Sequence, residues 1–182
     1  MKEQAYQQAL AFNPNIVVIK LGTNDSKSFN WVHKADFIKD TQTMIDAFKA
    51  LPSQPEIYLC YPSKAYLTGE SINDDIISKE IIPMIKKVAK KNKLPVIDLH
   101  SAMDGMPELF PDHIHPNEEG AKSDGKSCLR CYSKIKRKRR SRQELISQKK
   151  DFLSVVRIIH TSFLLCYSRQ STIFCSQTLS KQ

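Results

Sequence analysis

Several features that define common protein classes are missing from this 182-residue sequence. No run of apolar residues is long enough to cross a bilayer, and the N-terminus lacks the hydrophobic core of a secretory signal peptide. Glycine is scarce, with 5 residues, and none of them forms a phosphate-binding loop. The sequence also contains no internal repeat. These absences argue against a membrane-spanning protein, a P-loop nucleotide-binding protein and a repeat array.

Cysteine is nearly absent from the first 121 residues. Cys60, the one cysteine there, lies in an apolar run, which indicates a buried small hydrophobic side chain. Cys128 and Cys131 form an isolated Cys-x-x-Cys pair. Because no second Cys or His pair lies at ligand spacing, this pair does not predict a zinc or redox centre.

Charge and proline content change abruptly near residue 122. Residues 1–121 contain 13 Lys/Arg and 16 Asp/Glu, whereas residues 122–182 contain 15 Lys/Arg and 3 Asp/Glu. All 9 prolines lie at or before Pro116. The net charge of +9 therefore comes from the C-terminal region alone. We expect one domain over residues 1–121, followed by a basic tail over residues 122–182.

The tail has two possible explanations. Codons can be chosen for residues 122–137 so that removal of one adenine at Lys122 gives KAMAKVVLDAIQRSKE in the other frame, which has the apolar spacing of an amphipathic helix. We therefore expect residues 122–182 to be an out-of-frame, non-native or disordered tail. In the alternative, the basic run Lys134–Arg140 binds nucleic acid or anionic lipid, and residues 155–167 form an interfacial helix.

Apolar patterns in residues 1–121 alternate between two types. Short runs rich in β-branched residues predict buried strands, and longer segments with helical spacing predict amphipathic helices. The expected order is helix 3–12, strand 15–21, helix 36–51, strand 56–61, helix 73–91 and strand 95–99. Pro83 should kink the third helix or begin a new one. This alternation predicts an α/β fold, with a parallel sheet covered by helices on both faces.

Ligand sites in parallel sheets lie at the carboxyl ends of the strands. This rule selects three loops, at residues 22–31, 62–73 and 100–120. The first loop begins Gly22-Thr23-Asn24-Asp25, and the third contains Asp112-His113-Ile114-His115. Either motif alone is also common in ordinary turns and solvated loops.

Together the two motifs resemble the GxND and closing DxxH blocks of the SGNH/GDSL hydrolases. Their order and the intervening α/β pattern agree with that family over about residues 3–121. The resemblance is to its bacterial GDSL-like lipase and sialate O-acetylesterase-like branch. It implies a flavodoxin-like, three-layer α/β/α sandwich.

The resemblance also implies a role for each motif residue. His115 would be the general base, and Asp112 would orient it and stabilise its charged form. Asn24 would donate its side-chain amide to the oxyanion, and Gly22 would allow a tight turn beneath the substrate. His113 remains a rival for the base, and the family pattern favours His115.

The family's nucleophile block, Gly-Asp-Ser, has no counterpart in the sequence. Asp25-Ser26 follows the GxN motif, so we interpret Asp25 as a turn residue and Ser26 as a loop hydroxyl. By the resemblance, the fold is truncated and incomplete on its N-terminal side, which leaves the edge of the 15–21 strand open. We therefore expect an inactive fragment of a serine esterase.

The implied substrate is a short acyl ester, with an acetyl group on a carbohydrate as the expected case. No cofactor, metal or nucleic-acid partner is implied. A non-catalytic α/β binding module, or a tail that binds nucleic acid or an anionic membrane, stays open as an alternative function. Family members are often exported, but the chain carries no signal peptide, so the resemblance does not fix its location.

Overall fold

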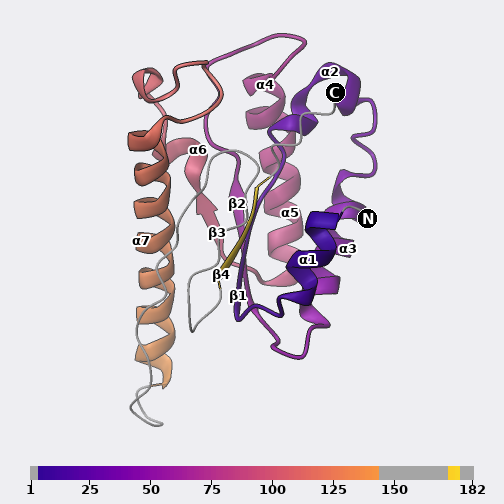
Figure 1. Cartoon of the computed structure of the whole chain (residues 1–182), viewed down its shortest axis with the longest axis vertical. Coiled ribbons are helices and arrows are strands. Elements are labelled where there is room, and N and C mark those ends of the chain that lie inside the picture. The colour runs from indigo at the N-terminus through magenta and orange to yellow at the C-terminus, as the bar shows by residue number, and fades with distance from the viewer. Residues whose placement is uncertain (1–3, 144–171, 177–182) are drawn as a thin grey trace.

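The computed structural model describes residues 4–143 and 172–176 and is built on a parallel sheet. Its strands are β1 (Ile16–Lys20), β2 (Glu56–Tyr61), β3 (Val96–Asp98) and β4 (Thr172–Ser176), in the spatial order β3-β2-β1-β4. Helices lie on both sides of the sheet (Figure 1). The predicted α/β fold with a parallel sheet between two helical layers is confirmed.

One face of the sheet is covered by α1 (Gln4–Ala11), α3 (Phe37–Lys49) and α5 (Ile82–Asn92). Their apolar sides pack on alternate residues of β1 and β2, because successive strand side chains point to opposite faces. This larger core includes Val17, Ile19, Ile45, Phe48, Ile57, Leu59, Ile85 and Val88, all at most 4% exposed.

The opposite face is covered by α6 (Leu99–Ala102) and the long helix α7 (Glu118–Gln143). Cys128 of α7 is buried against the strand residues of this face, Val18, Tyr58, Cys60 and Ile97. Two ion pairs also hold α7, from Lys20 to the buried Asp124 at 2.5 Å and from Lys136 to Glu56 at 2.8 Å.

Helix α7 runs across residue 122, where the composition changes. Its sheet-facing side carries Cys128, Cys131, Tyr132 and Ile135. The sequence as it stands therefore supplies an apolar stripe at helical spacing in this region. The division of the chain at residue 122 stays a prediction, and the expected interfacial helix at 155–167 lies outside the described residues.

The expected strands and helices of residues 3–99 are present, with ends shifted by one or two residues except for the 56–61 strand, which matches. The predicted effect of Pro83 is confirmed. The helical segment divides into α4 (Asp74–Ile76), a π-helical turn (Ile77–Ile81) and α5, which begins at Ile82. Proline has no N–H, so it cannot make the usual bond to the carbonyl four residues back.

The edge of β1 that was expected to lie open is paired. Strand β4 runs parallel to β1, with Ile16 opposite Thr172 and Lys20 opposite Ser176. The backbone groups on this side of β1 are therefore satisfied by a segment from the C-terminal region.

All four strands run in the same direction, so their carboxyl ends meet at one edge of the sheet. The three loops predicted to carry function leave this edge after β1, β2 and β3. Among the described helices, none is both long enough and apolar enough to span a membrane.

Candidate active site

The first and third loops contain short helical turns that fix their paths. The first loop forms a 3-10 turn at Asn24–Ser26 and the short helix α2 at Ser28–Trp31. The third loop begins within α6 and contains a 3-10 turn at Pro107–Leu109 before the Asp-x-x-His motif. The second loop, residues 62–73, lies between them in sequence and leads into α4.

Asp112 and His115 are brought together as the motif spacing predicts. Nδ1 of His115 lies 2.5 Å from Oδ2 of Asp112. The other carboxylate oxygen accepts the backbone N–H groups of Ile114 at 3.0 Å and His115 at 2.6 Å. A single turn of chain therefore fixes the carboxylate and aims it at the imidazole.

These contacts keep Asp112 ionised. Partial burial acts to raise the pKa of Asp112, but hydrogen bonds from the His115 ring and from the N–H groups of His115 and Ile114 outweigh it. The pKa falls to about 2. An ionised carboxylate on Nδ1 selects the imidazole tautomer in which Nε2 accepts a proton, which is the form that a general base needs.

His113, the rival base, has a different place in the turn. Its backbone has a φ of 65°, in the left-handed region, and its carbonyl accepts the N–H of Tyr66 at 2.8 Å. Within the described residues, its exposed side chain pairs with no carboxylate. The geometry of the turn thus favours His115 over His113 as the base.

Gly22 lies two residues beyond the end of β1 and cannot carry a side chain without strain. Its φ is +121°, and an added Cβ would lie 2.8 Å from Ile81 Cγ2 and 3.1 Å from Pro62 Cγ. Glycine is therefore required both by the backbone conformation and by the close packing of neighbouring elements.

Asn24 and Ser26 lie in the turn that comes after Gly22. The Asn24 carbonyl accepts the side-chain amide of Asn30 at 2.8 Å, which ties the turn to α2. Ser26 is fully buried; its Oγ donates to the Thr23 carbonyl at 2.7 Å and accepts the N–H of Asn73 at 3.0 Å. The structure therefore agrees with the interpretation of Ser26 as a loop hydroxyl.

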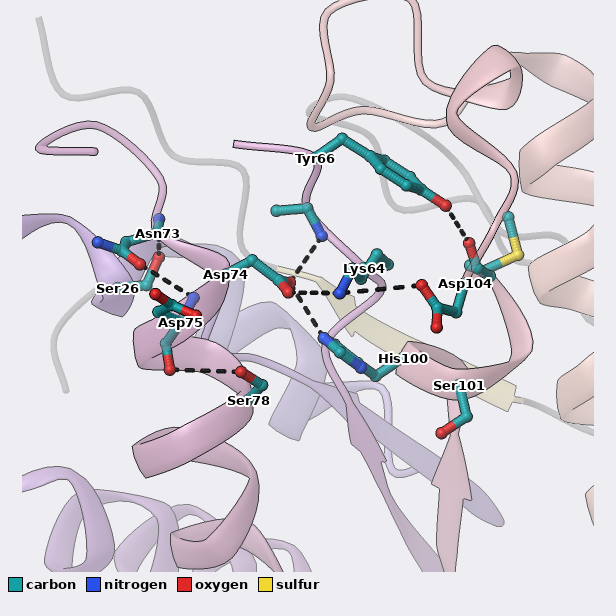
Figure 2. A network of polar contacts seen from close by, with 12 residues as sticks. Ser26, Lys64, Tyr66, Asn73, Asp74, Asp75, Ser78, His100, Ser101 and Asp104 are labelled. Atoms are coloured by element: carbon teal, nitrogen blue, oxygen red, sulfur yellow. Dashed lines mark hydrogen bonds and ion pairs between the residues drawn. The ribbon is translucent and has the colours of Figure 1, made fainter. Parts of the chain in front are cut away.

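A second Asp–His pair, which the sequence did not reveal, lies at the same edge of the sheet. Asp74 is buried and accepts from His100 Nε2 at 3.0 Å and from Lys64 Nζ at 2.8 Å (Figure 2). The Ala65 N–H donates to the same carboxylate at 3.0 Å. Burial acts to raise the pKa of Asp74, but these partners outweigh it and lower the pKa to about 2.

Tyr66 connects this network to the loop that carries Asp112 and His115. Its hydroxyl donates to the Met103 carbonyl at 2.6 Å and accepts the Met106 N–H at 2.7 Å. Its ring packs against Phe110, with centroids 5.3 Å apart. Figure 2 shows Tyr66 reaching across from the second loop to the third.

The sequence held only a weak signal for these residues. His100 comes after a predicted strand, and Lys64 and Tyr66 lie in the second predicted loop. Asp74, however, begins a helix 26 residues before His100, and no short motif joins them. A pairing at that separation depends on the three-dimensional path of the chain.

No cluster of three or more His, Cys, Asp or Glu side chains suited to a metal ion is found in the described part of the chain. Cys128 of the isolated Cys-x-x-Cys pair is buried beside Cys60 in the core. Burial raises the pKa of the Cys60 thiol well above its usual value. Cys60 is thus the buried hydrophobic side chain that the sequence predicted.

The fold and these motifs identify the class of protein. The chain belongs to the GDSL-like lipase/acylhydrolase family, whose model matches residues 1–122. The solved structure of a lipase/acylhydrolase from Enterococcus faecalis is 26% identical, with a TM-score of 0.59 over 74% of this chain and 68% of that one. A solved structure from Bacteroides fragilis NCTC 9343 shares the fold, with a TM-score of 0.55 over 71% of this chain and 70% of that one, at 24% identity.

An acetylxylan esterase from Xylanibacter ruminicola is 44% identical over 141 residues. The match covers 67% of this chain and 29% of that esterase. The chain thus spans less than a third of the length of this relative.

Proposed function

We propose that residues 1–122 carry the acid–base half of an esterase site that removes acetyl groups from a carbohydrate. The Asp112–His115 pair is the observation that carries this proposal, because its geometry suits a general base held by a carboxylate. Family membership supports ester hydrolysis, and the 44% identity to an acetylxylan esterase supports an acetylated sugar as the substrate.

In the proposed reaction, His115 removes the proton from a serine hydroxyl as that hydroxyl attacks the acetyl carbonyl. Asp112 stabilises the imidazolium that forms, and its pKa of about 2 keeps it ionised at neutral pH. Asn24 donates its side-chain amide to the oxyanion, a role that contributes roughly 3 kcal/mol in comparable sites. His115 then gives the proton to the sugar oxygen as its bond to the acetyl carbon breaks, which releases the sugar hydroxyl. Water, activated by His115, then hydrolyses the acetyl-serine and returns the proton to the serine oxygen.

The serine itself is the missing part of this scheme. The sequence contains no Gly-Asp-Ser motif, and both hydrogen-bonding directions of the buried Ser26 hydroxyl are occupied. We therefore propose that the 182-residue chain does not hydrolyse esters through His115 unless a serine-bearing segment is supplied. If the chain is instead a non-catalytic binding module, it should bind acetylated xylo-oligosaccharide without hydrolysing it.

Hydrolysis of p-nitrophenyl acetate tests this proposal. The chain alone should be no faster than its His115→Ala variant. Fusion of a family segment carrying Gly-Asp-Ser to its N-terminus should produce activity that His115→Ala abolishes and that His113→Ala, the matched control, retains.

Two results would contradict the proposal. A His115-dependent rate in the unfused chain would reveal another nucleophile. A folded fusion that lacks His115-dependent turnover of both p-nitrophenyl acetate and acetylated xylo-oligosaccharides would refute the role assigned to the pair.

A further inference from the structure

The second loop and the start of α4 form hydrogen bonds to both of the other loops at the carboxyl edge of the sheet. We propose that Asp74 is a positioning residue, which through Ala65 and Tyr66 sets the place of the turn that carries Asp112 and His115. This inference rests on the proposed function for its importance, but its test does not require turnover.

Asp74 is well placed to be a fixed reference point. It begins α4, where the side chain of Asn73 caps the helix by accepting the N–H groups of Asp75 and Ile76. The Asp74 N–H also donates to the Leu67 carbonyl at 3.0 Å, which closes the second loop on itself. The π-helical turn and α5, which follow α4, pack Ile77, Ile81 and Ile85 into the larger core.

From this anchor, the carboxylate holds the chain on both sides of the site. It accepts the Ala65 N–H and the Lys64 ammonium from the second loop, and the His100 ring from the segment after β3. Lys64 also lies 3.8 Å from Asp104 of that segment. Because this carboxylate is buried, water competes little for its oxygens, and its bonds to the three donors therefore restrain all three groups.

Tyr66, next to Ala65, carries this restraint to the Asp-x-x-His turn. Its N–H donates to the carbonyl of His113, which lies between Asp112 and His115 in sequence. Because His113 is in the left-handed conformation, the direction of its carbonyl is part of the turn geometry. The Tyr66 hydroxyl adds two bonds, to Met103 and Met106, earlier in the same loop.

The same segment also holds the loop that carries Asn24. The Asn73 N–H donates to Ser26 Oγ at 3.0 Å, and Ser28 donates to the Glu70 carbonyl through its N–H at 3.1 Å. The proposed oxyanion donor and the proposed base are therefore each tied to the second loop by separate contacts. This separation makes the two connections independently testable.

Nuclear magnetic resonance of the full chain provides the test, with the titration midpoint of the Asp112 carboxyl carbon and the ring-nitrogen shifts of His115 as readouts. Asp74→Asn should raise the Asp112 midpoint from about 2 toward the ordinary value of 3.8 and shift the His115 signals. Asp75→Asn is the matched control, because that neighbouring carboxylate is 60% exposed and pairs with Lys79.

Two further variants separate the connections. Tyr66→Phe removes the hydroxyl bonds but keeps the ring, and it should shift the Asp112 and His115 signals in the same direction by a smaller amount. Ser26→Ala should shift the Asn24 side-chain amide signal and leave His115 unchanged.

The inference is overturned if a folded Asp74→Asn chain keeps the Asp112 midpoint and His115 signals of the original. If Asp74→Asn does not fold, Tyr66→Phe decides, and unchanged signals there overturn the inference equally. Esterase activity in the serine-bearing fusion is a separate result, so its failure would leave the positioning role standing.

Discussion

Within residues 4–143, two aspartate–histidine pairs differ in almost every respect except the pKa of the aspartate, which is about 2 in both. In Asp112–His115 the partners are three residues apart, and their side chains are 54% and 42% exposed. In Asp74–His100 they are 26 residues apart, and the exposures are 9% and 14%. The first pair is made within one turn, and the second joins two distant segments.

The ring nitrogens used by the two histidines also differ. His115 faces its aspartate with Nδ1, whereas His100 faces Asp74 with Nε2. Asp74 also binds Lys64 and a backbone N–H, so its charge is shared among structural partners. An Asp–His contact alone therefore does not define a catalytic base. The role proposed for His115 depends also on the exposure of its side chain and on Nε2 being left to face a substrate.

The largest difference between the pairs should appear in stability. Asp74→Ala removes a buried carboxylate and leaves Lys64 and His100 without their shared partner, which should cost about 3 kcal/mol of unfolding free energy. Asp112→Ala, at an exposed pair, should cost less than about 1 kcal/mol. Urea denaturation of both variants checks this, and equal losses would show that the two pairs are energetically alike.

Acid pH should distinguish the pairs next. Both aspartates have a folded-state pKa of about 2, below the ordinary 3.8, so the unfolded chain binds more protons in this range and stability falls as pH drops from about 4 to 2. Asp74→Asn should remove about 2 kcal/mol of this loss, since Asp74 is buried. Asp112→Asn should remove much less because solvent screens the exposed pair.

The measurement is the unfolding free energy as a function of pH for the original chain and both variants. The prediction would be contradicted if the Asp74→Asn variant loses as much unfolding free energy at acid pH as the original chain does. Asp75→Asn again serves as the control, since Asp75 is an exposed neighbour on the same helix.

The smallest expected effect concerns the turn of the exposed pair. His113→Gly relieves a left-handed backbone conformation but adds freedom to the unfolded chain, for a net gain of about 0.5 kcal/mol. Lys93→Gly, at another left-handed position, should behave similarly and serves as the reference in thermal unfolding. If His113→Gly lowers the stability while Lys93→Gly raises it, the His113 side chain itself contributes to the stability of the turn.

These differences explain how far the sequence could predict the molecule. Strands such as Ile16–Lys20 could be predicted because both of their faces are buried, and Asp112–His115 because its contact is local. Asp74–His100 could not, since Asp74 at the start of α4 and His100 in α6 are 26 residues apart and meet only through the three-dimensional path of the chain. The pairing of β4 with β1 likewise depends on residues separated by most of the chain.

The π-helical turn at Ile77–Ile81 has a consequence for chain length. The N–H of Ile82 bonds to the Ile77 carbonyl, five residues back, so the turn holds one residue more than an α-helical turn. Removing Lys79 together with Pro83→Ala should therefore yield a continuous α-helix whose flanking apolar faces stay aligned. A one-residue deletion in the middle of α3 would instead rotate the rest of that helix by about 100° and turn its buried face toward solvent. We therefore expect this turn to be a place where the fold can lose one residue while α5 keeps its orientation on the sheet.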